Sequence, residues 1–284
     1  MTSRTFIAPH HIAPRKPHRR PLEAVAFGVR SLPLTFNRAF WRLVGLLLNI
    51  GLFMVLFQVY KVGRKTFIQR GETVGFANAE QIIHWQQSLH FFVELDVQQW
   101  ILQRPEWVIR GINYYYAGFM PIFYICCGLA LLFGPAQWRF WRQVFVISMV
   151  LALPWYAIYP LAPPRFMTDH GFVDTLAIYG PNYFKEGGMV TANRFAAMPS
   201  MHIGWSTIGA LMLVACLPKV RGFRIGLPIG IVHVMMMTLT VIATGNHYIL
   251  DAVGGWIIVA ASMLVAWKLT DRIPVRFPRL LSPD

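Results

Sequence analysis

Long runs of apolar residues alternate with short polar connections through most of this chain. Six such runs can be marked, at 40–60, 107–133, 140–159, 201–217, 225–244 and 248–269. A helix of about 20 apolar residues is long enough to cross the hydrocarbon core of a bilayer. The pattern therefore predicts an all-α fold, a polytopic membrane helix bundle with about six transmembrane helices.

The segment between the first two runs, 62–104, has a different pattern. Apolar residues such as Ile82, Trp85 and Leu89 recur there near helical spacing, but Glu and Gln side chains interrupt them. A stretch of this kind is too polar to span a bilayer and is typical of amphipathic helices that lie in the membrane interface. We expect one or two such helices on the outer side of the membrane.

The apolar runs divide the chain into three parts. Residues 40–269 form the predicted membrane catalytic domain, which contains the interfacial segment 62–104 and an outer loop at 160–199. The flanking parts, 1–39 and 270–284, are basic and contain few long apolar stretches. Segments of that composition lack the apolar surface that a folded core requires, so we expect both to be cytoplasmic tails.

The net charge of +14 at neutral pH indicates how the chain is oriented in the membrane and leaves the predicted fold unchanged. In a soluble protein such an excess would indicate nucleic-acid binding, but here the basic residues flank apolar runs. Cytoplasmic loops of membrane proteins are enriched in Lys and Arg, so we place both termini in the cytoplasm. Anionic lipid headgroups, not nucleic acid, are the expected partners. The basic residues of the inner connections are Arg139, Arg142, Lys219, Arg221, Arg224 and Lys268.

Some polar residues inside the runs have simple explanations. Cys126, Cys127 and Cys216 have neither the spacing of a disulfide framework nor that of a metal site, and we expect them to be small buried side chains. His233 stands alone in the middle of an apolar run. We expect it to bond a neighbouring helix and to take no part in chemistry.

Ionisable side chains gather where the apolar runs meet the outer connections. YPLAPPRF supplies Arg165, AAMPSMHIG supplies His202 and TGNHYILD supplies His247, with Asp251 at its end. An Asp inside a membrane helix is costly unless it has a partner, and such residues are usually functional. The predicted topology places all three stretches on the extracytoplasmic side, so we expect them to form one site there.

The spacing of His247 and Asp251 indicates an oriented histidine. The two residues are four positions apart, which puts them one turn apart on one face of a helix. A carboxylate in that position can hold the tautomer of the imidazole and stabilise its charged form. An imidazole held in this way is a nucleophile toward phosphorus.

The other two stretches offer the remaining groups that phosphoryl transfer requires. Pro199 suits the first position of a helix, and N–H groups at a helix N-terminus bind anions. Ser200 and His202 would then meet a phosphate in the first turn, and His202 can protonate a leaving oxygen. Arg165 can clamp phosphate oxygens or can instead anchor the chain at lipid headgroups. Ser200 can equally serve only as the helix cap.

PSMH at 199–202 and GNHYILD at 245–251 together resemble two motifs of the type-2 phosphatidic acid phosphatase superfamily, PSGH and SRxxxxxHxxxD. The resemblance implies that His247 is the nucleophile and forms a phosphohistidine. It also implies that Asp251 supports this histidine and that His202 protonates the leaving group. An enzyme of this kind is a lipid phosphatase or phosphotransferase and requires no metal and no organic cofactor.

The chain departs from the family pattern at its cations. The family has Lys seven residues before Arg165, where this chain has Ile158, and Arg six residues before the nucleophile, where it has Val241. Met201 also replaces the usual Gly, and nothing in the sequence explains it. These losses resemble the branch that contains inositol phosphorylceramide synthases and sphingomyelin synthases. A site with fewer cations suits a phosphodiester better than the more highly charged monoester.

These observations predict phosphotransfer from a phosphodiester lipid to a lipid or polyol alcohol. Hydrolysis of a lipid phosphate or an isoprenoid diphosphate stays open as an alternative. A non-catalytic transporter or scaffold also stays open, because intramembrane His and Asp can form a proton relay. Phosphate-binding roles fall to Arg165 and Ser200. The additional candidates for substrate binding are Lys185, Arg194, Asn246, which can instead cap the last helix, and Tyr248, which can instead pack in the core.

Overall fold

Much of the chain between the two termini has a defined structure. The ranges that the computed structural model describes are 34–66, 72–181, 194–220 and 222–270. Most of the two predicted tails, 1–39 and 270–284, lies outside these ranges. The candidate residue Lys185 also lies outside them. The chain divides into two units, 1–45 and 46–284, and the elements described below belong to the second, apart from the start of the first helix.

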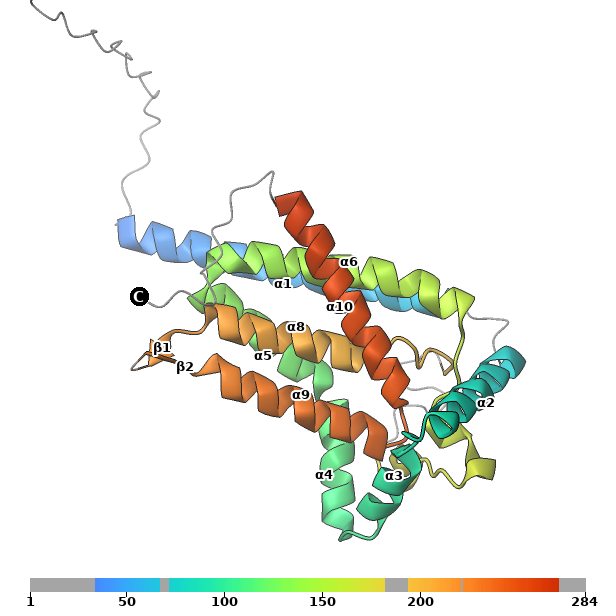
Figure 1. Ribbon diagram of the computed structural model, residues 1–284. Coiled ribbons are helices and arrows are strands. Elements are labelled where there is room, and N and C mark those ends of the chain that lie inside the picture. Colours follow the sequence, from blue (N-terminus) through green and yellow to red (C-terminus); the bar gives the residue numbers. More distant parts are fainter. Residues whose placement is uncertain (1–33, 67–71, 182–193, 221, 271–284) are drawn as a thin grey trace, which may run out of the picture. The chain divides into compact units, whose positions relative to one another are not determined.

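The described residues are mostly helical, as the apolar pattern predicted (Figure 1). The helices of the first half are α1 (Leu34–Thr66), α2 (Glu72–Ser88), α3 (Glu94–Leu102), α4 (Glu106–Ala117), α5 (Phe119–Phe133) and α6 (Pro135–Ile158). The elements of the second half are η1 (Pro164–Phe166), η2 (Thr168–His170), α7 (Thr175–Tyr179), α8 (Met201–Cys216), the antiparallel hairpin of β1 (Lys219–Val220) and β2 (Phe223–Arg224), α9 (Gly226–Ala243) and α10 (Ile249–Thr270).

By length and composition, the structure supports an integral membrane protein with three or four candidate spans. Helices α6, α9 and α10 each contain a stretch long and apolar enough to cross a membrane, and α4 with α5 makes a fourth span if this bent pair counts as one. Helix α8 and the part of α1 at Met54–Gly63 are shorter apolar helices. The count of six spans therefore stays a prediction.

The apolar run at 107–133 forms two helices where the pattern predicted one. Helices α4 and α5 meet at Gly118 and are bent by 53° relative to each other. The physical cause is Pro121, which lacks an N–H and whose ring would clash with the carbonyl of the residue four positions earlier in a continuous helix. That residue is Ala117, the last of α4. The break therefore follows from a proline that the apolar pattern alone did not weigh.

Helix α8 is the central helix of the described bundle and contacts α5, α6, α9 and α10 (Figure 1). Its Trp205 ring lies 4.9 Å from Phe145, 5.4 Å from Tyr60 and 5.7 Å from Phe57, centroid to centroid. The indole N–H donates to Ser148 Oγ at 3.0 Å, so the buried ring is both packed and hydrogen-bonded. This packing fixes the helix whose first turn carries the predicted site residues.

Two of the simpler expectations are confirmed. Cys126, Cys127 and Cys216 are all buried and free of disulfides. His233 Nδ1 on α9 lies 2.7 Å from the hydroxyl of Tyr115 on α4. A polar pair of this kind satisfies both groups within the apolar bundle, so His233 links two helices as expected.

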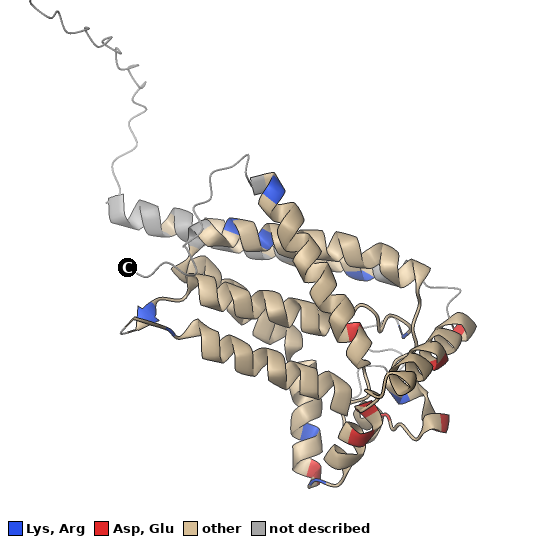
Figure 2. Cartoon of the chain, in the orientation of Figure 1, with Lys and Arg blue, Asp and Glu red and all other residues tan. Residues whose placement is uncertain are grey.

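The charged residues of the described chain are distributed unevenly (Figure 2). Helix α6 ends, α8 begins, α9 ends and α10 begins on the side where α2 and α3 lie (Figure 1). The described acidic residues all lie on α2–α4, in the loop after α6 or at the start of α10, and are Glu72, Glu80, Glu94, Asp96, Glu106, Asp169, Asp174 and Asp251. The opposite ends of the helices carry Arg139, Arg142, Lys219, Arg224 and Lys268.

Replacing Gly255 with Ala tests how closely α8 and α10 approach each other. A Cβ at Gly255 would overlap the backbone carbonyl oxygen of Ser200, and a backbone atom cannot rotate away. We expect Gly255→Ala to lower the free energy of unfolding by about 1–3 kcal/mol, as overpacking does, and to lower Tm in detergent.

Gly128→Ala on α5 is the matched control for this substitution. A Cβ at Gly128 meets no other atom within 4 Å, and Ala is the better helix former, so we expect an unchanged or higher Tm. A Gly255→Ala protein that melts at or above the wild-type Tm would contradict the close approach of the two helices.

Candidate active site

Backbone hydrogen bonds tie together the three segments that carry the predicted site residues. The loop after α6 pairs with the segment before α8, which in turn bonds the start of α10, and the link before α10 bonds back to the loop. The structure thus brings the three segments to one place, through main-chain atoms. The bonds run from the N–H of Leu161 to the carbonyl of Phe195 (2.8 Å), from Ser200 to Asp251 (2.8 Å) and from Arg165 to Gly245 (2.7 Å).

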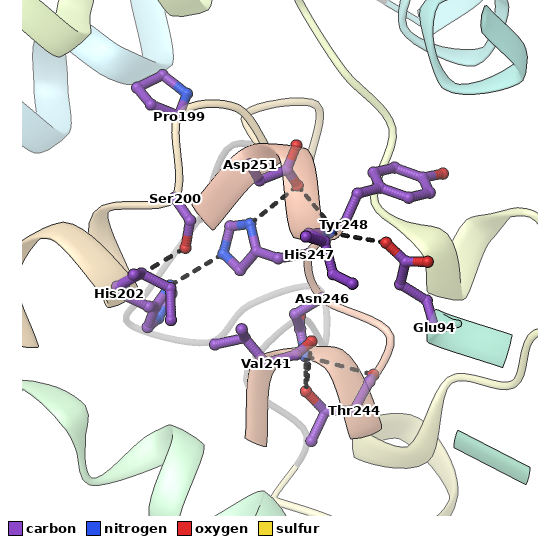
Figure 3. Close-up of polar contacts among 12 residues, drawn as sticks. Glu94, Pro199, Ser200, His202, Val241, Thr244, Asn246, His247, Tyr248 and Asp251 are labelled. Atoms are coloured by element: carbon purple, nitrogen blue, oxygen red, sulfur yellow. Dashed lines mark hydrogen bonds and ion pairs between the residues drawn. The ribbon is translucent and has the colours of Figure 1, made fainter. Parts of the chain in front are cut away.

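His247 is positioned by Asp251 (Figure 3). Its Nδ1 lies 3.3 Å from Asp251 Oδ2, and the same oxygen accepts the backbone N–H of Tyr248 at 2.9 Å. His247 precedes α10, which begins at Ile249, so a turn brings the pair together and the predicted placement on one helix face is wrong. A carboxylate accepts a hydrogen bond from an N–H group, so Nδ1 of His247 carries the proton, and we therefore assign the lone pair of the neutral imidazole to Nε2.

His202 faces this lone pair from the first turn of α8. Its Nδ1 lies 3.2 Å from His247 Nε2, and the two ring centroids are 5.3 Å apart (Figure 3). A phosphoryl group that reaches Nε2 of His247 would therefore meet His202 next to it. The geometry suits a pair in which one imidazole attacks phosphorus and the other exchanges a proton with the departing or entering oxygen.

Two aromatic rings hold His202, and the sequence interpretation missed both. Tyr116 stacks on its imidazole with centroids 4.6 Å apart and planes at 26°, and the Phe119 ring lies 4.7 Å away. The neighbours of Tyr116 face elsewhere: Tyr114 is exposed and Tyr115 bonds His233. Three consecutive tyrosines near a helix end read equally well as interfacial anchors, so no pattern singled out the one that contacts the site.

Ser200 is the N-cap of α8. Its Oγ accepts the backbone N–H of Ile203 at 3.4 Å, and the helix begins at Met201. Pro199 therefore lies before the helix, and its predicted place at the first helical position is wrong. The Pro199 carbonyl instead accepts the Tyr156 hydroxyl at 3.0 Å. Met201 packs in the buried core, which gives this unusual residue of the motif a structural role.

Arg165 lies in η1 and is almost fully buried, with 4% of its surface exposed. Its Nε lies 3.5 Å from Asp174 Oδ2. Its guanidinium also lies 4.7 Å above the Phe166 ring, and Arg194 approaches the same ring at 5.6 Å. Burial lowers the pKa of Arg165, whereas the nearby Tyr116 and Asp174 act to raise it. Two guanidinium groups thus share one aromatic ring at the edge of the site.

Ile158 and Val241 occupy the positions where the family has Lys and Arg, so neither position brings a positive charge to the site. Ile158 at the end of α6 is exposed. Val241 is fully buried, and its carbonyl accepts the backbone N–H groups of Asn246 at 2.9 Å and His247 at 3.2 Å. The Val241 position therefore anchors the link that carries the predicted nucleophile.

Two other candidates have contacts that point to structure. The Asn246 side chain donates through Nδ2 to Thr244 Oγ1 at 2.7 Å and so bonds the end of α9, not the start of α10 (Figure 3). Tyr248 is fully buried in a core cluster with Ile82 and Ile83 of α2. These contacts support packing for Tyr248 and a turn-forming role for Asn246.

Glu94, the first residue of α3, supports the start of α10 and was not foreseen. It is fully buried, and its Oε1 accepts Gln86 Nε2 and the backbone N–H of Ile249, the latter at 2.7 Å (Figure 3). Burial raises the pKa of this carboxyl, and the two hydrogen bonds oppose that rise. An acidic residue in the first turn of a helix is common at surfaces, so nothing in the sequence indicated this contact.

Comparisons with known proteins place these residues in one matched region. A model described as "PAP2 superfamily" matches residues 80–265. The "Inositol phosphorylceramide synthase catalytic subunit aur1" of Schizosaccharomyces pombe is 27% identical over 188 residues, 61% of this chain and 42% of that protein. The "Phosphoinositol dihydroceramide synthase" of Bacteroides thetaiotaomicron is 29% identical over 161 residues, 48% of this chain and 51% of that protein.

The chain thus spans about half the length of the curated relatives it matches. No solved structure shows a significant match. The matched residues include every described side chain of the site, from Glu94 on α3 to Asp251 on α10.

Substitution of Glu94 tests its support of α10. In Glu94→Ala the N–H of Ile249 and the Gln86 amide lose their acceptor, and an unsatisfied buried group costs about 1–3 kcal/mol. We expect a clear fall in Tm in detergent. Glu94→Gln keeps an acceptor oxygen of similar reach and should melt close to the wild type.

Asp96→Ala is the matched control, because Asp96 lies in the same first turn of α3 but is exposed. We expect almost no change in its Tm. Equal Tm values for Glu94→Ala and Asp96→Ala would show that the Glu94 contact contributes nothing to stability.

Proposed function

Since the chain belongs to the PAP2 superfamily, we propose that it transfers a phosphorylated headgroup from a phosphodiester lipid to an alcohol through a phosphohistidine. It is an integral membrane enzyme of the lipid phosphatase and phosphotransferase class. Both relatives carry names that combine phosphorylated inositol with ceramide or dihydroceramide. Phosphoinositol is therefore the headgroup, and a ceramide-type lipid the acceptor, with which the proposal begins.

The proposed reaction has two displacements at phosphorus. In the first, Nε2 of His247 attacks, the bond between phosphorus and the glycerol oxygen of the donor breaks, and protonated His202 gives its proton to that oxygen. In the second, the hydroxyl of the acceptor attacks phosphorus and gives its proton to His202, while the phosphorus–nitrogen bond breaks. The headgroup leaves on the acceptor, and both histidines return to their first state.

The observation that carries this proposal is the facing pair of imidazoles. Nε2 of His247 and Nδ1 of His202 are 3.2 Å apart, and Asp251 holds the remaining nitrogen of His247. Asp251 can stabilise the imidazole as positive charge develops on it. Arg165 is the described cation that we assign to the phosphate oxygens, and we assign Ser200 to capping.

The charge distribution supports a site on the extracytoplasmic side, with both termini in the cytoplasm. Arg139 and Arg142 near the start of α6, Lys219 and Arg224 in the β1–β2 hairpin and Lys268 near the end of α10 lie at the ends opposite to the site. The site side carries Arg104, Arg110, Arg165 and Arg194 together with all the described acidic residues, so its charge is mixed. An excess of basic residues marks the cytoplasmic ends of membrane helices. In this proposal α1 and α8 complete a set of six spans.

A lipid panel tests the reaction. Purified protein is mixed with phosphatidylinositol and a ceramide in detergent micelles, and the products are identified by mass spectrometry. We expect diacylglycerol and an inositol-phosphate-bearing ceramide in equal amounts. Diacylglycerol with free inositol phosphate and no inositol-phosphate-bearing ceramide would identify water as the acceptor. Much faster turnover of phosphatidic acid than of any diester would contradict headgroup transfer.

His247→Ala serves in the same assay as the test of the nucleophile. We expect product formation to vanish. Folded protein should still be recovered, because Asp251 keeps the backbone N–H of Tyr248 as a partner, although loss of the His247 contact lowers Tm. His84→Ala, an exposed histidine on α2, is the control and should retain full turnover. Turnover that survives His247→Ala would overturn the phosphohistidine.

The proposed role of His202 predicts a dependence on the leaving group. A nitrophenolate departs without a proton, whereas the glycerol oxygen of a lipid requires one. We expect His202→Gln to slow the first displacement by about 10²–10⁴-fold with a lipid donor, the range for general acid catalysis. The burst of nitrophenol from a nitrophenyl phosphodiester should slow far less. Equal losses with both substrates would exclude His202 as the acid.

A further inference from the structure

Asp174 occupies a fixed position next to Arg165, and each oxygen of its carboxylate has its own contact. Oδ1 accepts the backbone N–H of Ala177 at 3.0 Å and caps α7. Oδ2 lies 3.5 Å from Nε of Arg165.

The backbone on both sides of Asp174 is held by buried amide side chains. Gln98 of α3 accepts the N–H of Val173 at 2.8 Å and donates to its carbonyl at 3.0 Å. Asn113 of α4 donates to the carbonyl of Thr175 at 2.8 Å and accepts its hydroxyl at 2.9 Å. Gln98 and Asn113 are both fully buried. The carboxylate is therefore part of a built structure and not a loosely tethered surface charge.

Arg165 in turn is bound to the segment that carries the nucleophile. Its backbone N–H donates to the carbonyl of Gly245, two residues before His247. Tyr116, which stacks on His202, acts to raise the pKa of Arg165. The Arg165–Asp174 pair is thus connected to both histidines.

We propose that Asp174 makes the site selective for the single negative charge of a phosphodiester by offsetting part of the charge of Arg165. This inference deepens the proposed function and rests on it. Removal of one negative charge near the phosphate lowers the binding free energy of a dianion about twice as much as that of a monoanion. The reason is that the Coulomb energy is proportional to the charge of the ligand. Together with Ile158 and Val241, which replace two family cations, Asp174 disfavours phosphate monoesters.

Asp174→Asn tests this selectivity with little change of shape. Asn is as good an N-cap as Asp, so α7 keeps its cap while the charge is lost. We measure kcat/KM for phosphatidic acid, a monoester, and for phosphatidylinositol, a diester, in the same micelles. We expect the ratio of monoester to diester to rise roughly three- to tenfold. Asp174→Ser, which also keeps a capping oxygen, is the second variant if the first fails to fold.

Asp169→Asn is the matched control, because Asp169 lies in the same loop, is exposed and changes the net charge equally. Its ratio should stay at the wild-type value. An unchanged or lower ratio in Asp174→Asn would overturn the inference. So would equal rises in Asp174→Asn and Asp169→Asn, since these would reflect only the net charge of the loop.

Binding of small phosphate esters separates this inference from the proposed reaction. The dissociation constants of methyl phosphate and dimethyl phosphate, measured by calorimetry, report the same charge preference without turnover. A tighter methyl phosphate complex in Asp174→Asn, with little change for dimethyl phosphate, supports the inference even where the lipid panel yields no transfer. An unchanged ratio of the two constants rejects it even where transfer is observed.

Discussion

The structure of the site depends on how one buried carboxylate is satisfied. Asp251 is 0% exposed, and its Oδ2 accepts both Nδ1 of His247 and the backbone N–H of Tyr248. Its backbone carbonyl accepts the N–H of Ser200. A buried carboxylate without partners is strongly unfavourable, so these contacts must form together. One residue therefore sets the tautomer of the predicted nucleophile and its distance from His202 on the neighbouring helix.

Helices α2 to α4 support this arrangement with buried polar side chains that lie among the apolar residues of their inner faces. Their buried faces include polar side chains that bond the loops of the site, while large aromatic residues lie outside. The fully buried polar residues are Gln86, Glu94, Gln98 and Asn113, and the exposed indoles are Trp85, Trp100 and Trp107. Trp at such positions is typical of a membrane interface. The predicted interfacial segment 62–104 therefore acts, together with α4, as a scaffold for the loops of the candidate site.

These buried polar side chains explain which features the sequence could predict and which it could not. Runs of bilayer length located α6, α9 and α10 to within a few residues. The motif spacing selected His202, His247 and Asp251 as candidates, and the structure brings these three side chains together. The Glu and Gln residues of 62–104 were interpreted as interruptions of an apolar face, although several are buried hydrogen-bonding groups. Apolar periodicity shows which face of a helix is hydrophobic. It does not show which residue, distant in the sequence, a polar side chain on that helix will hydrogen-bond. The bond between Glu94 and Ile249, 155 residues apart, is of this kind.

The burial of the site bears on the choice between water and an alcohol as acceptor. His247, Asp251 and Arg165 are each at most 5% exposed, so bulk solvent has little access to these side chains. Water is abundant, and a transferase favours an alcohol only if the intermediate is shielded until the acceptor is bound. An acceptor that is itself a lipid reaches such a site from the bilayer, where the exposed faces of α9 and α10 are apolar. Shielding from water and access from lipid together favour transfer over hydrolysis.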